Sequence, residues 1–216
     1  MKKLFLASAS RARKKLLEEA GIACTCAHHT ADERSCPWTG KLEDLTGRLA
    51  QLKMAHVVLP AGAFDGQICF VLTADTLTRA LAAGEEHNDA PIIGKPQDHA
   101  DAIAIIKRVR DGITCTTGFC LERRVWCDGV WQTQQQYTGF ASGWCSLAIA
   151  DDEIEDYFVH LKKYSGYNYL ALAGAFSITG YGMQFLKEVR GSYSAILGLP
   201  MLEIQVGLKE IGFYEY

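Results

Sequence analysis

Short apolar runs alternate with amphipathic stretches along the chain, which is the pattern of an α/β protein. Residues 4–7 and 68–72 are apolar throughout and predict buried strands. Further strands are predicted at 113–121, 125–131, 136–149 and 183–189. Asp128–Gly129 is predicted to be a turn in a region that looks antiparallel. We therefore expect an α/β fold with a mixed, partly antiparallel sheet flanked by helices.

Apolar residues at helical spacing predict the helices between these strands. The first begins at the N-cap Ser10, carries Leu16 and Leu17 on its apolar side and ends at Gly21. The other predicted helices are 41–59, one capped by Asp98, one opened by Asp151 and one at 200–211. Residues 22–40 and 164–182 are expected to be irregular, and Gly84–Asp89 is expected to form a polar loop.

The length of 216 residues suits one large domain or two lobes. A net charge of −3 gives no general attraction to nucleic acid or to an anionic membrane, so neither is expected as a partner. No apolar run approaches the roughly 20 residues needed to span a bilayer. The apolar run at 4–6 is too short for a signal peptide. We therefore expect a cytoplasmic protein.

Eight cysteines are scattered without any Cys-x-x-Cys pair, and we expect them to be reduced and buried. Five potential metal ligands lie close together at Cys24, Cys26, His28, His29 and Cys36. Their spacing lacks the two paired ligands of a structural zinc site. We interpret them as surface or loop residues.

Asp75 and Lys95 suggest a site for a polyanion. Asp75 follows the strand 68–72, and the carboxyl end of a strand is where open α/β sheets bind ligands. Lys95 follows a second short apolar run that begins at Ile92. An acid and a base at the ends of neighbouring strands favour a phosphate site in which the acid holds a metal. The alternative is a solvated aspartate in a turn.

The turn from Ser8 to Arg13 is a second candidate phosphate site. It presents two hydroxyls and free backbone N–H groups at a helix N-terminus, beside Arg11 and Arg13. It is not a P-loop. An N-capped helix with a solvated basic face is an equal alternative. Lys53, on the flank of the 41–59 helix, is either solvated or directed into a cleft.

Four segments spread over nearly the whole chain share the motifs of one family. The first is Leu4-Phe5-Leu6-Ala7-Ser8-Ala9-Ser10-Arg11-Ala12-Arg13, against L-x-L-A-S-x-S-P-R-R, and the second is Leu49-Ala50-Gln51-Leu52-Lys53-Met54-Ala55, against L-A-x-x-K-A. The third is Ala74-Asp75-Thr76 with Gly94-Lys95-Pro96, and the fourth is Ala173-Gly174-Ala175-Phe176 with Gly191-Ser192-Tyr193 and Gly198-Leu199-Pro200. In this order and spacing they resemble the Maf family of nucleoside triphosphate pyrophosphatases.

The resemblance implies a Maf/ITPase-like fold, with residues 1–216 forming a single domain whose two lobes surround a deep cleft. It implies hydrolysis of a nucleoside triphosphate, often a modified one in a house-cleaning role, to the monophosphate and pyrophosphate. It also implies a divalent metal, with Mg²⁺ the first candidate and Mn²⁺ or Co²⁺ the others. A homodimer is the implied assembly.

Carried over by motif, Asp75 is similar to the family's catalytic acid and Glu33 to the second acid near the metal, with Asp32 as a near alternative. The candidate phosphate ligands are Ser8, Ser10, Arg11, Arg13, Lys53 and Lys95. This chemistry needs a carboxylate or a metal to activate water, and cations to neutralise the departing pyrophosphate. Whether Asp75 is a base, a metal ligand or both stays open.

The departures from the family pattern affect the choice of base. Arg11 and Ala12 replace the Pro and the first Arg, Thr179 replaces a Gln or Glu, and Ala171-Leu172 replaces an Asp-Lys pair. Positions 12, 76 and 179 resemble those that select the base. Thr76 resembles the dTTP/UTP subgroup, whereas Ala12 and Thr179 resemble neither common subgroup. Base preference therefore stays open, with dTTP, UTP and modified nucleotides as candidates.

A second function is compatible with the same residues. The altered positions 12 and 179 allow a non-catalytic, nucleotide-binding regulatory protein on the same fold. The presence of Glu33, Lys53, Asp75 and Lys95 favours catalysis over this alternative.

Overall fold

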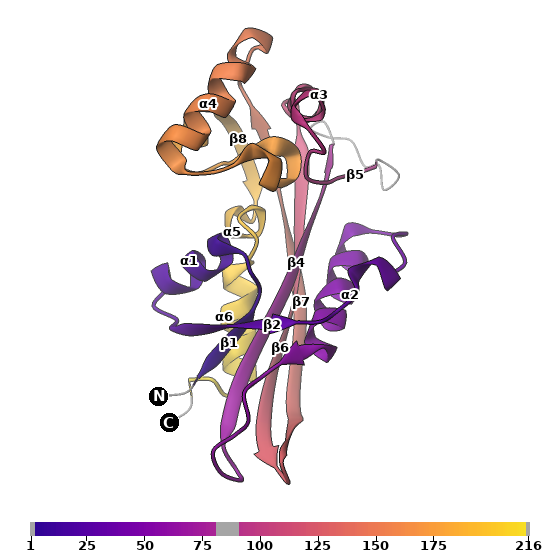
Figure 1. Ribbon diagram of the computed structural model, residues 1–216, viewed down its shortest axis with the longest axis vertical. Coiled ribbons are helices and arrows are strands. Elements are labelled where there is room, and N and C mark those ends of the chain that lie inside the picture. Colours follow the sequence, from indigo (N-terminus) through magenta and orange to yellow (C-terminus); the bar gives the residue numbers. More distant parts are fainter. Residues whose placement is uncertain (1–2, 81–90, 215–216) are drawn as a thin grey trace. The chain divides into compact units, whose positions relative to one another are not determined.

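The computed structural model describes residues 3–80 and 91–214, which divide into two compact units. The first unit comprises the described residues of Met1–Thr76, Thr116–Ala141 and Ser194–Tyr216. The second comprises those of Leu77–Cys115 and Ser142–Tyr193. Three long strands contribute to both units: β4 (Ile68–Ala80), β6 (Ile113–Cys127) and β7 (Val130–Leu147) (Figure 1).

The sheet of the first unit is mixed. β1 (Leu4–Ala7) lies parallel to β2 (Cys24–His29) on one side and to β4 on the other. β2 also pairs with the short antiparallel strand β3 (Val57–Val58), while β6 follows β4 and β7 follows β6 in the strand order. The expected mixed α/β architecture is confirmed.

Alternating side chains of these strands fill two separate hydrophobic layers, because successive residues of a strand point to opposite faces. Leu4, Leu6 and Phe70 pack on one face with residues of α1 (Arg11–Glu19) and α6 (Met201–Glu210). Phe5 and Val71 pack on the other face with residues of α2 (Leu42–Ala55). Figure 1 shows α2 on one side of the strands and α1 and α6 on the other. Burial on both faces explains why these strands are apolar runs rather than alternating patterns.

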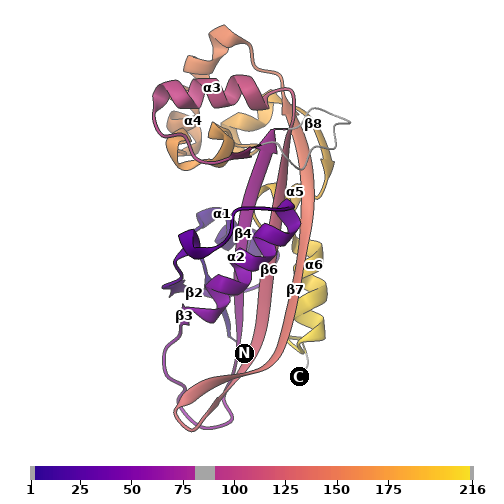
Figure 2. The ribbon, with the colours of Figure 1, turned by 90° about the vertical axis from the view of Figure 1, so that its right-hand side faces the viewer.

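The second unit is built on the far ends of β4 and β7. The end of β4 pairs antiparallel with β5 (Ile92–Ile93), and the end of β7 pairs antiparallel with β8 (Leu186–Gly191). Two helices, α3 (His99–Val109) and α4 (Ile154–Ser165), lie next to each other in this unit (Figure 2). Short 3₁₀ segments account for much of the rest: η2 (Asp151–Glu153), η3 (Tyr169–Ala171), η4 (Ala173–Ala175) and η5 (Gly180–Phe185).

Most predicted elements are present, and the exceptions have physical causes. The helices predicted from Ser10, Asp98, Asp151 and 200–211 are confirmed, and so is the turn at Asp128–Gly129, where both residues have positive φ. The helix predicted at 41–59 is present but ends at Ala55, and its last predicted residues include the strand β3. The prediction of irregular structure at 22–40 is wrong for β2, whose side chains are mostly exposed and give no apolar pattern. β6 and β7 are single long strands where shorter pieces were predicted, since polar side chains cover their solvent-exposed hairpin end. The predicted loop Gly84–Asp89 lies outside the described residues.

The cysteines differ partly from the prediction. All eight belong to the described part of the chain and all are free. Five are buried, but Cys24 and Cys127 are half-buried and Cys26 is exposed, so the expectation of general burial is wrong for these three. Cys24 and Cys26 lie on the poorly covered strand β2, which explains their exposure.

No helix in the described ranges combines the length and apolar character that a membrane crossing requires.

Candidate active site

An ion cluster of Asp75, Lys53 and Glu33 lies in the first unit. The Lys53 ammonium donates to Asp75 Oδ1 and lies 3.2 Å from Glu33 Oε1. Lys53 and Asp75 are buried, whereas the Glu33 side chain is 41% exposed. One lysine therefore brings together two carboxylates that are 42 positions apart in the sequence.

Asp75 does not end its strand, and the prediction that it does is wrong. β4 continues to Ala80 because β5 takes up pairing at Thr78. The parallel pairing of β4 with β1 stops at Leu72, opposite Leu6. Asp75 thus lies just beyond the carboxyl end of β1, which is the edge where a parallel sheet binds ligands.

The position of Lys53 is set by the packing of α2. Leu45, Leu49 and Ala50 bury the helix, and the Thr73 hydroxyl donates to the Ala50 carbonyl oxygen at 2.7 Å. That bond joins α2 to β4 two residues before Asp75. Lys53 is therefore buried rather than solvated, so the solvated interpretation is wrong, while its direction into a cleft stays a prediction.

Glu33 begins a single helical turn, η1 (Glu33–Ser35). Asp32 is the N-cap of this turn, and its carboxylate accepts from the Arg34 backbone N–H at 3.1 Å. Between the two acids that the sequence left open, Glu33 is the one that meets Lys53, while Asp32 stabilises the turn.

The turn between β1 and α1 is held by its own hydroxyls. Ser10 caps α1 by accepting from the Arg13 N–H at 3.4 Å, as predicted. The Ser8 hydroxyl oxygen accepts from the Ser10 N–H at 3.2 Å and from Arg13 Nη1 at 3.1 Å. With both lone pairs used, Ser8 keeps its proton for donation to a ligand.

The Arg13 guanidinium is anchored by three groups. It donates from Nη1 to Ser8, from Nε to the Gly198 carbonyl oxygen at 2.8 Å and from Nη2 to Thr76 Oγ1 at 3.1 Å. Since a guanidinium has five N–H groups, two remain without a partner in the described part of the chain. Burial lowers the pKa of Arg13, and the negative charges of Asp75 and Glu33 oppose that shift. Arg13 therefore shares one electrostatic environment with the two acids.

Thr76 is part of a hydrogen-bond chain whose direction is determined. Thr117 Oγ1 donates to the Ala195 carbonyl oxygen at 2.7 Å, which can only accept. Thr117 has no second proton, so in the 2.7 Å contact between the two hydroxyls Thr76 is the donor. The proton of Thr76 is thus committed to Thr117, and its oxygen accepts from Arg13.

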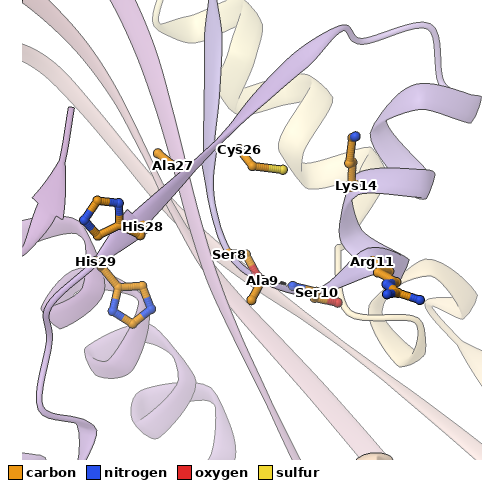
Figure 3. A pocket seen from close by; sticks show the side chains of 9 residues that line it. All are labelled: Ser8, Ala9, Ser10, Arg11, Lys14, Cys26, Ala27, His28 and His29. Carbon is orange, nitrogen blue, oxygen red and sulfur yellow. Dashed lines mark hydrogen bonds between the residues drawn. The ribbon is translucent and has the colours of Figure 1, made fainter. Parts of the chain in front are cut away.

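A pocket of about 320 Å³ opens beside the β1–α1 turn. Figure 3 shows that its lining side chains come from the turn, from α1 and from β2. Arg11 and Lys14 supply positive charge, and the Arg11 side chain is exposed. Ala12, next to it, is half-buried on the first turn of α1.

His29 is a pocket residue that the sequence analysis did not connect with the phosphate site. It lines the pocket on the side of β2 opposite to His28 (Figure 3). Burial lowers its pKa, and the charge of Lys53 lowers it further. Its Nδ1 is buried without a hydrogen-bond partner in the described part of the chain. The only sequence signal for His29 is its place in the cluster of Cys and His residues between 24 and 36, which was considered only as a zinc site.

Lys95 and Thr179 belong to the second unit, and their participation in the site stays a prediction. Lys95 is exposed two residues after β5. The Thr179 hydroxyl lies 3.1 Å from Ser177 Oγ and 3.4 Å from Tyr167 Oη.

The sequence was compared with known protein families and with curated proteins. The profile of the family described as "Maf-like protein" matches residues 3–211, so the chain belongs to the Maf family. A "dTTP/UTP pyrophosphatase" of Anaeromyxobacter dehalogenans is 33% identical, over 98% of this chain and 95% of that protein. A protein of the same name from Hydrogenovibrio crunogenus is 27% identical, over 99% and 98% of the two chains. A "Nucleoside triphosphate pyrophosphatase" of Salinispora tropica is 31% identical, over 92% of this chain and 79% of that protein.

Proposed function

We propose that this protein is a nucleoside triphosphate pyrophosphatase, a hydrolase that cleaves the bond between the α- and β-phosphates and releases a nucleoside monophosphate and pyrophosphate. Family membership and the names of the relatives support this activity. The observation that carries it is the ion cluster of Asp75, Lys53 and Glu33, which shares its electrostatic environment with Arg13.

In this proposal the cations of the site bind the polyphosphate. The spare N–H groups of Arg13 and the proton of Ser8 donate to phosphate oxygens. The Ser10 hydroxyl and Arg11 contribute from the same turn and pocket. Lys53 and Lys95 neutralise charge that develops on the departing pyrophosphate.

Asp75 is the proposed catalytic group. Its Oδ1 accepts from Lys53, so the carboxylate is held in one orientation. Its second oxygen is then free to accept a proton from an attacking water or to bind a cation.

The two carboxylates also fit the divalent metal that the family resemblance implies. No group of three or more His, Cys, Asp and Glu side chains suited to a metal occurs in 3–80 and 91–214. A pair of carboxylates is nevertheless the donor set of Mg²⁺, which binds one or two of them and completes its shell with waters and phosphate oxygens. Glu33 and Asp75 would hold the ion, which when bound neutralises phosphate charge and lowers the pKa of water. Mn²⁺ and Co²⁺ are the other candidates.

We further propose dTTP or UTP as the first substrates to test, since relatives carry those names. Ala12, Thr76 and Thr179 are the proposed specificity positions. Because Thr76 gives its proton to Thr117, Thr76 offers a ligand only acceptor capacity. Modified pyrimidine nucleotides are the next candidates, as Ala12 leaves more room than the family's arginine. The family resemblance also supports a cytoplasmic homodimer.

The test is a pyrophosphate-release assay on standard and modified triphosphates with Mg²⁺, Mn²⁺ and Co²⁺. We expect turnover by the wild type and a loss of at least about 10²-fold in Asp75→Asn, because the variant lacks the carboxylate charge and base. Asp65→Asn, which changes an exposed aspartate of the same unit, is the matched control and should keep full activity. Nucleotide binding without pyrophosphate release under all three metals would instead support the non-catalytic regulatory protein.

A further inference from the structure

We propose that Thr117 is a positioning residue of this site: it orients the Arg13 guanidinium through Thr76 without touching the nucleotide. The inference rests on the proposed function, in which Arg13 binds the polyphosphate. Thr117 belongs to none of the motifs that the sequence analysis connected with the site.

The hydroxyl of Thr117 is buried and fully committed. Thr117 has no exposed surface, and its oxygen lies 2.7 Å from both the Ala195 carbonyl oxygen and Thr76 Oγ1. Ala195 is likewise fully buried. Water therefore cannot replace either partner of the Thr117 hydroxyl. Because Thr117 donates to Ala195, it must accept from Thr76, which sets the donor and the acceptor at each step of the hydrogen-bond chain.

The fixed direction matters because a threonine hydroxyl can donate or accept. If the Thr76 proton were free to rotate, it could turn toward Arg13, where a second positive hydrogen would face the guanidinium. Thr117 prevents this by accepting that proton. Thr76 then always presents a lone pair to Arg13 Nη2, at 3.1 Å.

The backbone beside Thr117 packs closely against α2. A Cβ on the neighbouring Gly118 would lie 2.6 Å from the Thr46 carbonyl carbon and 2.7 Å from the Gly47 nitrogen. β6 therefore touches α2 directly beside Thr117. The last acceptor of the hydrogen-bond chain is the carbonyl oxygen of Ala195. Three residues later, the carbonyl oxygen of Gly198 accepts from Arg13 Nε. Both acceptors that hold this network come from residues 195–198.

Removal of the Thr117 hydroxyl should loosen Arg13 rather than remove it. Arg13 keeps its bonds to Ser8 and Gly198, so its charge stays in the site. Its orientation toward phosphate is less well defined, which weakens binding of the ground state and transition state alike. The expected signature is a raised KM at nearly unchanged kcat.

The experiment compares Thr117→Val, which keeps the shape and removes the hydroxyl, with Thr117→Ser, which keeps the hydroxyl. The substrate is the triphosphate that the wild type turns over fastest with Mg²⁺. We expect Thr117→Val to raise KM about five- to tenfold, the equivalent of one net hydrogen bond. The kcat should stay within about twofold of the wild type, and Thr117→Ser should restore the wild-type KM.

Thr46→Val is the matched control. Thr46 is also fully buried, and its hydroxyl also donates to a backbone carbonyl oxygen, that of Leu42 at 2.8 Å, but this bond lies within one helix and does not involve Arg13. An equal rise of KM in Thr46→Val, or a Thr117→Ser variant as weak as Thr117→Val, would overturn the assignment. The double variant Thr76→Val/Thr117→Val should have the same KM as Thr76→Val alone, because both residues act through one chain of hydrogen bonds to Arg13. Additive increases in KM would also contradict the assignment of Thr117. If the wild type releases no pyrophosphate, the proposed function fails, whereas an active wild type with an unaffected Thr117→Val refutes only this inference.

Discussion

Lys53 decides the electrostatics of the site because it is the only cation with a direct ion pair to either carboxylate in residues 3–80 and 91–214. Any metal ion that these two acids bind would lie close to the Lys53 ammonium, and the two positive charges would repel each other. Lysine and metal would therefore compete in part for the negative charge of the carboxylates. The lysine holds the two carboxylates close together, and it would limit how tightly a metal binds.

Lys53→Met should separate these two effects. We expect a loss of about 10²–10³ in kcat, since a charge-stabilising donor has been removed. Two facing carboxylates without their partner should also destabilise the fold by about 3 kcal/mol. Because the repelling ammonium is gone, Mn²⁺ should bind more tightly than to the wild type. Thermal unfolding in EDTA and in Mn²⁺ measures this, with the larger Mn²⁺-dependent rise in Tm expected for the variant.

Lys41→Met is the control for that change. Lys41 is exposed at the opposite end of the same helix. It should respond to Mn²⁺ as the wild type does. A Lys53→Met variant whose Tm is no more sensitive to Mn²⁺ than that of Lys41→Met would remove the basis for placing a metal at Glu33 and Asp75.

At the residue scale, motifs identified the charged groups but not the groups that orient them. Lys53, Asp75 and Glu33 were candidates from the sequence, and they do come together. Thr117 and His29 were not identified. Thr117 bonds to residues distant in the sequence, and His29 reaches the pocket only because β2 pairs beside β1. A single threonine or histidine in a sequence has no pattern that shows such a position.

At the scale of elements, the site depends on how closely α2 approaches the sheet. Gly118 of β6 provides a close contact, because its missing side chain lets the backbone of Thr46 and Gly47 come near. The Thr73–Ala50 bond fixes the same helix along β4. Together these contacts place the last turn of α2, and with it Lys53.

Gly118→Ala tests this dependence. The added methyl must push α2 away from β6, which should cost about 1–3 kcal/mol of stability. The displacement of Lys53 should lower kcat at least about tenfold, since shifts of an ångström at an active site have effects of this size or larger. Denaturant unfolding and the pyrophosphate assay measure the two effects.

Gly47→Ala is the counterpart on the helix side of the same contact. A Cβ at Gly47 meets nothing within 4 Å, and alanine is the better helix former. We expect it to stabilise the protein by about 0.5–1 kcal/mol and to leave turnover unchanged. If Gly118→Ala were as stable and active as Gly47→Ala, the close approach of α2 to β6 would not control the site.

The limits of sequence reasoning at this scale are visible in β2 and β4. β2 lacks an apolar alternation, so only its hydrogen bonds to β1 and β3 define it as a strand. β4 reads as a short strand because polar Thr73 and Asp75 interrupt its apolar run. In the proposed function both residues contribute to the site, Asp75 directly and Thr73 by fixing α2, so the polar positions that hid the length of β4 are also proposed functional positions.

At the scale of the whole molecule, the fold class followed from the apolar runs that fill the two hydrophobic layers. A cleft between two lobes stays a prediction, since hydrophobic periodicity reports local structure and burial rather than the placement of larger parts.

The net charge of −3 affects how a substrate is attracted to the protein. Attraction of a triphosphate must come from the local cations rather than from the protein as a whole.

The last prediction concerns ligand-linked stability. Asp75→Asn should bind a nucleoside triphosphate with Mg²⁺ without consuming it, because the phosphate-binding cations are intact. At a ligand concentration of about 100 times Kd the folded state gains about 2.7 kcal/mol, which for a chain of this size raises Tm by about 5–10 °C. The matching monophosphate at the same concentration should give a much smaller rise, since it lacks the phosphates that Arg13 and Lys53 would meet. Differential scanning fluorimetry with both nucleotides measures the difference. Equal shifts would mean that the nucleoside, and not the polyphosphate, supplies the binding energy, and the local cations would then lose their proposed role.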